Sequence, residues 1–273
     1  MSIDQTGRFT DRADHYARFR PGYPSGIIRI LERRIGFDEM DVVADMGSGT
    51  GLLTKLFLEN GNKVFAVEPN LEMRSHAEKD LDLFAKFVSV SGTAENTTLP
   101  PRSVDLAVVG QALHWFDAAK ALAELRRILK RRGNLCVVYN DRRQDGFGRA
   151  YGRVVKRNQR DRSKVPNPDD AYISGFFRKG KYYKFKVPNE QLLDFEGLLG
   201  RFLSASYLPS RNDKSFANLY EDVKKLFVEH SAKGHVKLRY NTTVYLGPVA
   251  ERAQRMQRRM RKAPDDPSNR LFK

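Results

Sequence analysis

An apolar run that leads into three alternating glycines constrains this chain more than any other part of its sequence. Residues 42–46 read Val-Val-Ala-Asp-Met, residues 47–51 read Gly-Ser-Gly-Thr-Gly, and residues 52–58 are mostly apolar again. This pattern predicts a buried parallel strand, a turn and a helix. Glycine permits the sharp turn and lets a ligand lie against bare backbone, while the helix N-terminus offers unpaired N–H groups. We therefore expect a ligand-binding turn here rather than a turn without a ligand.

Strand and helix patterns alternate up to residue 140, which predicts a doubly wound, mostly parallel α/β sheet. Strands are expected at residues 42–45, 63–67, 87–90, 104–109 and 135–139, and helices at 51–59, 71–80 and 117–130. The last helix is expected to end before Gly133, after a basic turn that includes Lys130, Arg131 and Arg132. Farther along, we expect helices near 147–160, 191–204 and 216–231, and strands near 181–187 and 235–246.

The glycine spacing separates two classes of nucleotide-binding enzyme. A dinucleotide fingerprint, G-x-G-x-x-G, would require glycine where Leu52 stands. An acidic residue two places before G-x-G-x-G, here Asp45, instead resembles the first motif of class I S-adenosylmethionine (SAM)-dependent methyltransferases. In that family the loop faces the methionine part of SAM, which implies cofactor contacts for Gly47, Ser48, Gly49, Thr50 and Gly51.

Residues just past the next two strands supply further cofactor contacts that the resemblance implies. Open parallel sheets bind ligands outside the carboxyl ends of their strands. Glu68, followed by Pro69, ends the second strand, where a carboxylate can accept both ribose hydroxyl hydrogens. After the third strand, Ala94 can flank adenine, and Glu95 or its neighbouring backbone can meet the exocyclic amine. For both acids the alternative is a solvated surface carboxylate.

The segment after the fourth strand reads Gly-Gln-Ala-Leu-His-Trp-Phe from residue 110 to residue 116. Gln111 and Ala112 are expected to contact the cofactor, and Phe116 is expected to pack in the core. His114 and the only tryptophan, Trp115, are expected beside the sulfonium or the substrate. If the acceptor needs a base near neutral pH, His114 is the candidate catalytic residue.

Residues 9–24 supply independent support for the family. Their pattern, F-x-x-x-A-x-x-Y-x-x-x-R-P-x-Y-P, resembles the lead-in helix of the type 11 methyltransferases. That group includes enzymes similar to trans-aconitate methyltransferase and the ubiquinone/menaquinone-biosynthesis methyltransferases, in which this helix forms part of the lid. Tyr16 and Arg20 share a helix face, so both can point at the cofactor carboxylate or the substrate. Alternatively, Arg20 only anchors the segment to the sheet.

Downstream matches to the same group add three candidate substrate residues to Trp115. They are Tyr139 and Arg142, from an aromatic-Asn-x-Arg-like sequence, and Tyr207, from a Ser-x-Ser-Tyr segment. Residues 243–247 resemble the closing strand of the group. The resemblance is weakest over residues 141–181, where the substrate would be chosen.

The resemblance implies a class I methyltransferase Rossmann-like fold, with a seven-stranded, mostly parallel sheet, helices on both faces and a small helical cap. We divide the chain into four parts on this basis. They are an N-terminal lid (1–36), a SAM-binding core (37–140), a cap insertion with the C-terminal part of the same domain (141–250) and a basic, partly disordered tail (251–273).

Positive charge is concentrated in two parts of a chain whose formal net charge is +16. Residues 126–186 hold 19 Lys and Arg against 5 Asp and Glu, and residues 251–273 hold 8 against 3. The charge can be a solvated surface, or a phosphate-binding surface over 149–164 and 252–262 in an RNA- or DNA-modifying enzyme. It can also attract an acidic small molecule to a pocket bordered by Arg142, Arg143, Arg149, Arg153, Lys156 and Arg157. No recognised RNA-binding module supports the nucleic-acid interpretation, which is therefore not favoured.

Composition limits the remaining options. Cys136 is the only cysteine and lies in an apolar run, which predicts a buried thiol, no internal disulfide and a reducing cytoplasm. The five histidines show no metal-site spacing, so no metal is expected. The apolar runs are too short for a membrane span, and the polar N-terminus lacks a secretory signal.

These observations together predict a SAM-dependent methyltransferase that acts on an oxygen or nitrogen of a small, acidic molecule. A nucleic-acid methyltransferase and a SAM-binding protein without catalysis are the alternatives.

Overall fold

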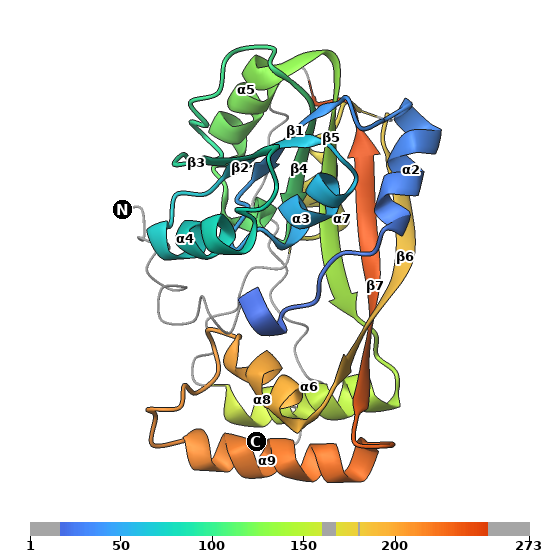
Figure 1. Cartoon of the computed structure of the whole chain (residues 1–273). Coiled ribbons are helices and arrows are strands. Elements are labelled where there is room, and N and C mark those ends of the chain that lie inside the picture. Colours follow the sequence, from blue (N-terminus) through green and yellow to red (C-terminus); the bar gives the residue numbers. More distant parts are fainter. Residues whose placement is uncertain (1–16, 160–167, 180, 251–273) are drawn as a thin grey trace, which may run out of the picture.

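A single sheet of seven strands organises the computed structural model, which describes residues 17–159, 168–179 and 181–250 (Figure 1). The strand order is β3-β2-β1-β4-β5-β7-β6. The strands are β1 (Val42–Met46), β2 (Lys63–Val67), β3 (Phe87–Val90), β4 (Val104–Gly110), β5 (Leu129–Arg142), β6 (Tyr183–Leu193) and β7 (Val236–Gly247). Strands β1 to β5 pair in parallel, and β7 pairs antiparallel to both β5 and β6. The mostly parallel, seven-stranded architecture expected from the sequence is confirmed.

Helices cover both faces of this sheet because alternate strand residues point to opposite sides. One face packs on α2 (Gly26–Ile35), α3 (Leu52–Glu59) and α4 (Leu71–Asp80). The other face packs on α5 (Ala118–Ile128) and α7 (Asp170–Ser174). Val43 and Leu106 belong to the first layer, and their chain neighbours Ala44 and Ala107 to the second.

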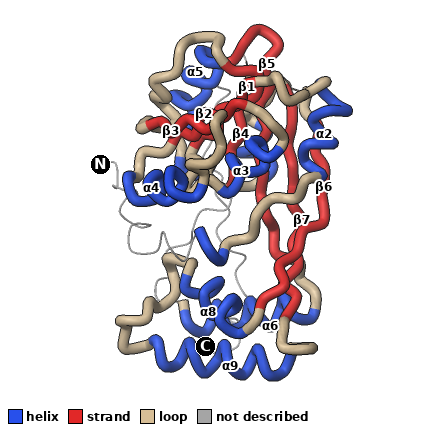
Figure 2. Tube along the Cα trace, in the orientation of Figure 1, coloured by secondary structure: helices blue, strands red, loops and turns tan. Residues whose placement is uncertain are grey.

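A separate helical lobe lies beyond the carboxyl end of β5, at the bottom of Figures 1 and 2. It consists of α6 (Gly146–Asn158), α8 (Phe195–Leu203) and α9 (Phe216–His230), which share a hydrophobic core with one end of β7. Strands β6 and β7 stay paired from Tyr183–Leu246 to Leu193–Val236, so they run from the central sheet into the lobe. The lobe is the helical cap of this fold.

The predicted boundaries are wrong mainly in two places: β5 spans 129–142 and not 135–139, and β6 extends to residue 193 and not 187, which shifts the helix ends beside them. The helix predicted over 117–130 ends at Ile128, because Leu129 turns to an extended conformation and pairs with Val104 as the start of β5. Lys130, Arg131 and Arg132 are therefore strand residues, and the last helical turn holds only Arg126 and Arg127 as basic residues.

The helix predicted from residue 191 starts at Phe195 instead. Strand β6 continues to Leu193, and the Asp194 side chain caps α8 by accepting a hydrogen bond from Gly197 N at 2.7 Å. Helices α2 and α7 have no counterpart among the helices predicted from the sequence.

Cys136 is fully buried in β5, and burial raises the pKa of its thiol to about 12, which confirms the predicted core cysteine. Within the described ranges, none of the helices has the length and hydropathy needed to cross a bilayer.

Candidate functional site

The glycine loop between β1 and α3 adopts a backbone that few other residues tolerate. Gly47, Gly49 and Gly51 have φ angles of 70°, 57° and 81°, all in the left-handed region that favours glycine. A Cβ at Gly47 would lie 2.9 Å from the Cβ of Ala112, and one at Gly51 would lie 2.6 Å from Leu81 Cδ1. The first and third glycines thus allow close packing, whereas a Cβ at Gly49 would meet only Met73 Cε, at 3.6 Å.

Glu68 stands beside this loop, at the carboxyl end of β2. Its Oε2 accepts a hydrogen bond from Gly49 N and its Oε1 accepts one from Asn70 N, both at 2.9 Å. Burial raises the pKa of the Glu68 carboxyl above its ordinary value, against the lowering effect of these two N–H groups. Each oxygen keeps a second lone pair, so the carboxylate is oriented and can accept further hydrogen bonds.

Asp45 ends β1 below the loop and is 1% exposed. Its Oδ2 accepts a hydrogen bond from Thr54 Oγ1 at 2.7 Å. Its Oδ1 is buried and finds no hydrogen-bond partner among the described residues, as is also true of the Ser48 and Thr50 hydroxyls. Burial raises the pKa of Asp45 to about 7, and the nearby charge of Glu68 adds to that rise.

The raised pKa of Asp45 predicts that Asp45→Asn stabilises the protein more at high pH than at low pH. The native state holds a proton on Asp45 up to about pH 7, whereas the unfolded state releases it near pH 4. The free energy of unfolding of the wild type therefore falls as the pH rises between these values. Urea unfolding of both proteins at about pH 5 and about pH 8 measures the effect. An equal difference between the two proteins at both pH values would contradict it.

The segment after β4 returns to the glycine loop through a strained residue. Gln111 has φ = 58°, which is uncommon for a residue other than glycine and is typical of functional sites. Its N–H donates to Val138 O at 3.0 Å, and the next residue, Ala112, packs against Gly47. The fourth strand end is thereby held directly beside the loop.

His114 and Tyr139 meet at the carboxyl ends of β4 and β5. His114 Nδ1 lies 3.3 Å from the Tyr139 hydroxyl, and the imidazole ring lies 4.6 Å from that of Trp115. Burial lowers the pKa of His114 to about 4, so the ring is neutral at physiological pH. Burial also raises the pKa of Tyr139 well above its usual range, so the phenol keeps its proton. Phe116 packs partly buried against the core.

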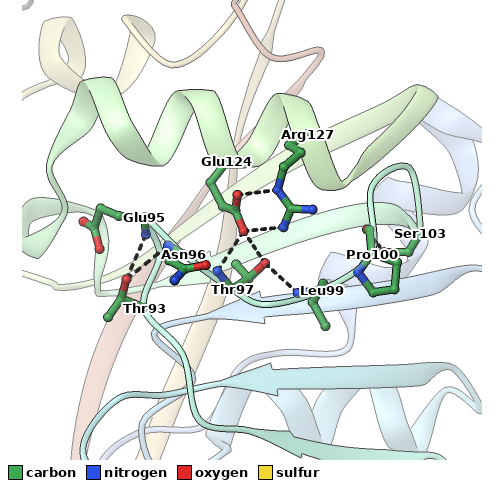
Figure 3. A network of polar contacts seen from close by, with 9 residues as sticks. All are labelled: Thr93, Glu95, Asn96, Thr97, Leu99, Pro100, Ser103, Glu124 and Arg127. Atoms are coloured by element: carbon green, nitrogen blue, oxygen red, sulfur yellow. Dashed lines mark hydrogen bonds and ion pairs between the residues drawn. The ribbon is translucent and has the colours of Figure 1, made fainter.

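The loop after β3 is fixed by a carboxylate of α5 (Figure 3). Glu124 accepts hydrogen bonds from the backbone N–H and the hydroxyl of Thr97 and from the guanidinium of Arg127. Ala94 is buried, and Glu95 Oε1 accepts a hydrogen bond from Asp117 N at 2.8 Å. The Glu95 carboxylate therefore contacts the start of α5. Glu124 was not among the residues singled out from the sequence.

The N-terminal segment crosses the carboxyl edge of the sheet. Gly22 O accepts hydrogen bonds from Asn140 Nδ2 at 3.2 Å and from Asn189 Nδ2 at 2.9 Å. Arg20 Nη2 donates to Ser204 O at 2.9 Å, so Arg20 connects the segment to the helical lobe. Tyr16 lies outside the described residues.

The basic residues considered for a pocket rim separate into two groups. Arg142 is part-buried, and its guanidinium carbon lies 4.7 Å above the Tyr151 ring. The other five are exposed and are Arg143, Arg149, Arg153, Lys156 and Arg157. Tyr207 packs partly buried against the core of the helical lobe. Residues 160–164 and the tail lie outside the described residues.

A surface hollow of about 510 Å³ lies at the opposite end of the strands. Asp41, Asp105 and Gly133 are among its lining residues, at the amino ends of β1 and β4. Parallel sheets bind ligands at the carboxyl ends instead. We therefore place the candidate site at the glycine loop and the carboxyl ends of the strands, and not at this hollow.

Comparison with known proteins decides the family. Residues 44–137 match a family model described as a methyltransferase domain. An uncharacterized methyltransferase of Mycobacterium tuberculosis is 36% identical over 173 residues, which cover 60% of this chain and 67% of the relative. The chain belongs to the methyltransferase-domain family.

Other relatives of this methyltransferase agree. An uncharacterized methyltransferase of Schizosaccharomyces pombe is 34% identical over 137 residues, 49% of this chain and 52% of that protein. A candidate type II methyltransferase structure from Anaeromyxobacter dehalogenans matches with a TM-score of 0.62 at 22% identity, over 84% of this chain and 98% of its own. The YcgJ protein of Bacillus subtilis matches with a TM-score of 0.53 at 16% identity, over 83% and 99%.

Both structural matches establish the fold, which is that of class I methyltransferases. A protein of Saccharomyces cerevisiae that is named as a SAM-dependent methyltransferase is 27% identical over 124 residues, 44% of this chain and 42% of its own.

Proposed function

We propose that this methyltransferase transfers a methyl group from SAM to an oxygen or nitrogen atom of a small, acidic molecule. Arg142 carries the proposal. It lies at the carboxyl end of β5, its Nε is buried, and within the described chain that atom has no hydrogen-bond partner. Burying such a donor is costly unless something accepts from it. An anionic acceptor molecule would supply both the hydrogen bond and the opposite charge.

The residues at the carboxyl edge fit the cofactor. Glu68 has lone pairs directed beside a glycine loop, where ribose hydroxyls can donate to them. The hydroxyls of Ser48 and Thr50 and one oxygen of Asp45 are buried without partners in the described structure, as expected where a polar ligand completes a site. We assign cofactor contacts to Arg20, Asp45, Gly47, Ser48, Gly49, Thr50, Gly51, Glu68, Pro69, Ala94, Glu95, Gln111 and Ala112.

The chemistry that remains for the protein is modest, because SAM supplies a methyl group already activated on a sulfonium. The site has to orient the acceptor and exclude water. A carboxylate acceptor needs no base, whereas a hydroxyl or amine acceptor must lose a proton. The neutral imidazole of His114, next to the Tyr139 phenol, can accept a hydrogen bond from that group, although a pKa of about 4 makes it a weak base at neutral pH. We assign the substrate side to Trp115, Tyr139, Arg142 and Tyr207.

The buried environment of His114 predicts that the pKa of its ring is far below that of an ordinary histidine. Carbon–proton NMR spectra of the imidazoles between about pH 4 and about pH 8 should show one ring that stays neutral down to about pH 4. The signal that disappears in His114→Gln identifies it. An apparent pKa near 6.5 for that signal would show that the ring is solvated and would contradict its burial.

Turnover is tested by the release of S-adenosylhomocysteine from SAM in the presence of acidic metabolites, their methyl esters or bulk RNA. We expect release with free acids, and a kcat/KM about 10- to 100-fold lower in Arg142→Gln, because a charged hydrogen bond is lost. Arg131→Gln removes an exposed charge at the far end of β5 and should have no effect. Release with RNA alone would replace the proposal by the nucleic-acid alternative.

A further inference from the structure

A second arginine, Arg201 of α8, is part-buried in the helical lobe and has no acidic partner among the residues that the structure describes. Its Nε donates to the Tyr240 hydroxyl and its Nη1 donates to Ser204 Oγ, both at 3.3 Å. No carboxylate of the described residues forms an ion pair or a hydrogen bond with it. Its helix packs through Leu198 and Phe202, which are fully buried. A guanidinium stays protonated in such surroundings, so the lobe contains a fixed positive charge.

Arg142 reaches the same place from β5. It pairs with Tyr240 in the register of β5 and β7, and its guanidinium lies over the ring of Tyr151. That ring stacks on Phe202, the residue after Arg201 in α8, with centroids 4.1 Å apart. Arg142 thus lies over Tyr151 and pairs across the strands with Tyr240, the tyrosine whose hydroxyl accepts from Arg201.

A continuous set of hydrogen bonds orients Arg201. The Tyr240 hydroxyl that accepts from Arg201 donates to Gln191 Oε1 at 2.8 Å, and Gln191 Nε2 donates to Phe19 O at 3.1 Å. Arg20, the next residue, donates to Ser204 O, and the Ser204 hydroxyl accepts from Arg201. This set of hydrogen bonds forms a closed ring that begins and ends at Arg201. The orientation of its guanidinium is therefore fixed from two sides.

The same contacts place the two arginines near the methyl-transfer site. Arg20 is two residues from Gly22, which lies at the carboxyl edge of the sheet, and two residues span at most about 7 Å. Along β5, Arg142 is three residues from Tyr139, about 10 Å at the rise of a strand. The two side chains point to opposite faces of β5, and the pairing of β5 with β4 ends at Val138. A small molecule that passes this free edge of β5 can place its reacting atom at His114 and Tyr139 and another group at the arginines.

Neither Arg142 nor Arg201 has a carboxylate partner among the described residues, and this indicates a ligand. Removing a cation from water costs several kcal/mol, and the cost is recovered only when an anion and its hydrogen bonds replace the water. Two guanidiniums that both neighbour Tyr240 suit a carboxylate, which can accept from both.

We propose that Arg142 and Arg201 form a subsite that binds a carboxylate of the methyl acceptor, with Tyr151 as its wall. The inference rests on the proposed transfer to an acidic molecule and narrows it. The acceptor carries a carboxylate that is separate from the atom receiving the methyl group, so it is a dicarboxylate, a polycarboxylate or an acid with a distant hydroxyl or amine. The carboxylate of SAM itself is the other source of the same chemistry, and the experiment separates the two.

Calorimetric titration of succinate and citrate into the protein saturated with S-adenosylhomocysteine tests the subsite. We expect the Kd of these carboxylates to rise at least about tenfold in Arg201→Gln and in Arg142→Gln, through loss of a charged hydrogen bond. The affinity for S-adenosylhomocysteine should change by less than about twofold in Arg142→Gln, since the Arg142 side chain bonds to none of the residues assigned to the cofactor. Arg201→Lys should retain part of the carboxylate affinity, and Lys225→Gln, an exposed charge on α9, should match the wild type. Dimethyl succinate, which carries no charge, should not bind.

Equal carboxylate affinity in the wild type and both glutamine variants would overturn the subsite, even if the wild type methylates acidic molecules. Weaker binding of S-adenosylhomocysteine with unchanged carboxylate binding would overturn it too, by assigning the arginines to the cofactor. If Arg201→Gln binds no S-adenosylhomocysteine because it does not fold, Arg142→Gln decides the question alone. The guanidinium of Arg142 donates no hydrogen bond within the described structure, so its loss leaves no partner unsatisfied and should affect folding less than the loss of Arg201. A wild type that binds S-adenosylhomocysteine and carboxylates but methylates no acid contradicts the proposed function rather than the subsite.

Discussion

Glu68→Ala should weaken the binding of S-adenosylhomocysteine about 10- to 100-fold, as expected for the loss of hydrogen bonds to a charged group. Glu68 is the acid beside the glycine loop, and both of its oxygens are already oriented by backbone N–H groups. Loss of the carboxylate removes the acceptors proposed for the ribose hydroxyls. It also leaves the N–H groups of Gly49 and Asn70 without their partner. Isothermal titration calorimetry of the purified variant measures the change.

Two further variants make the Glu68 experiment specific. Glu68→Gln keeps the side-chain size but leaves a single oxygen, so its affinity should fall between those of the wild type and Glu68→Ala. Glu72→Ala removes an exposed acid from the first turn of α4, one turn away, and should bind as the wild type does. An unchanged Kd in Glu68→Ala would show that the ribose is held elsewhere.

Glu124→Ala should lower the free energy of unfolding by about 2–4 kcal/mol, the sum of a lost charged hydrogen bond and an unsatisfied buried N–H. Glu124 is 7% exposed and accepts hydrogen bonds from Thr97 N and Arg127 Nε, each at 2.7 Å. The half-exposed Arg127 adds less than a fully buried partner would. Urea unfolding measures the loss. Glu59→Ala, which breaks an exposed pair with Lys55, should cost less than about 1 kcal/mol.

The contribution of Glu124 to the free energy of unfolding should decrease as the pH falls. The hydrogen bond from Arg127 is the main cause that lowers the pKa of Glu124 to about 2 in the native state, against an ordinary value of 4.5. The stabilisation by its charge is therefore complete above about pH 4.5 and is lost as the pH falls toward about 2. The difference between wild type and Glu124→Ala should shrink over that range. A difference that stays constant would mean that packing, not charge, holds the loop.

The sheet core was predictable because its signals are local. Buried parallel strands appear as short apolar runs, and β2 and β3 have the predicted bounds. The turn at residues 47–51 also carries its own signal, since glycine readily adopts the positive φ found at all three of its glycine positions. Helix α4 begins at the predicted residue because Asn70 caps it, accepting from Met73 N.

Other boundaries depend on pairing that the local sequence does not encode. Leu129 leaves the helix because Val104 of β4 is available to pair with it, 25 residues earlier in the chain. The basic residues 130–132 suit the end of a helix equally well as the start of a strand. Likewise, β6 extends to Leu193 because β7 accompanies it along its whole length.

The charged residues of the site were the least predictable part. The basic segment drew attention to α6, yet its arginines at positions 149, 153 and 157 are exposed. Arg201 was overlooked although its signal is visible, since it is the only cation in the apolar helix 195–203. The role proposed for Arg201 depends on its contact with Tyr240, 39 residues away. It also depends on the lack of an ion pair between Arg201 and any acid of the described structure. Spacing along the chain cannot supply either observation.

Nitrogen–proton NMR spectra of protein labelled at glycine, recorded with and without S-adenosylhomocysteine, locate the cofactor directly. Binding at the carboxyl edge predicts shifts of the Gly47, Gly49 and Gly51 amides, assigned by single substitutions, while Gly146 and Gly234 stay in place. Shifts confined to Gly36 and Gly133, which line the hollow at the opposite end of the strands, would contradict the placement of the nucleoside beside the glycine loop and Glu68.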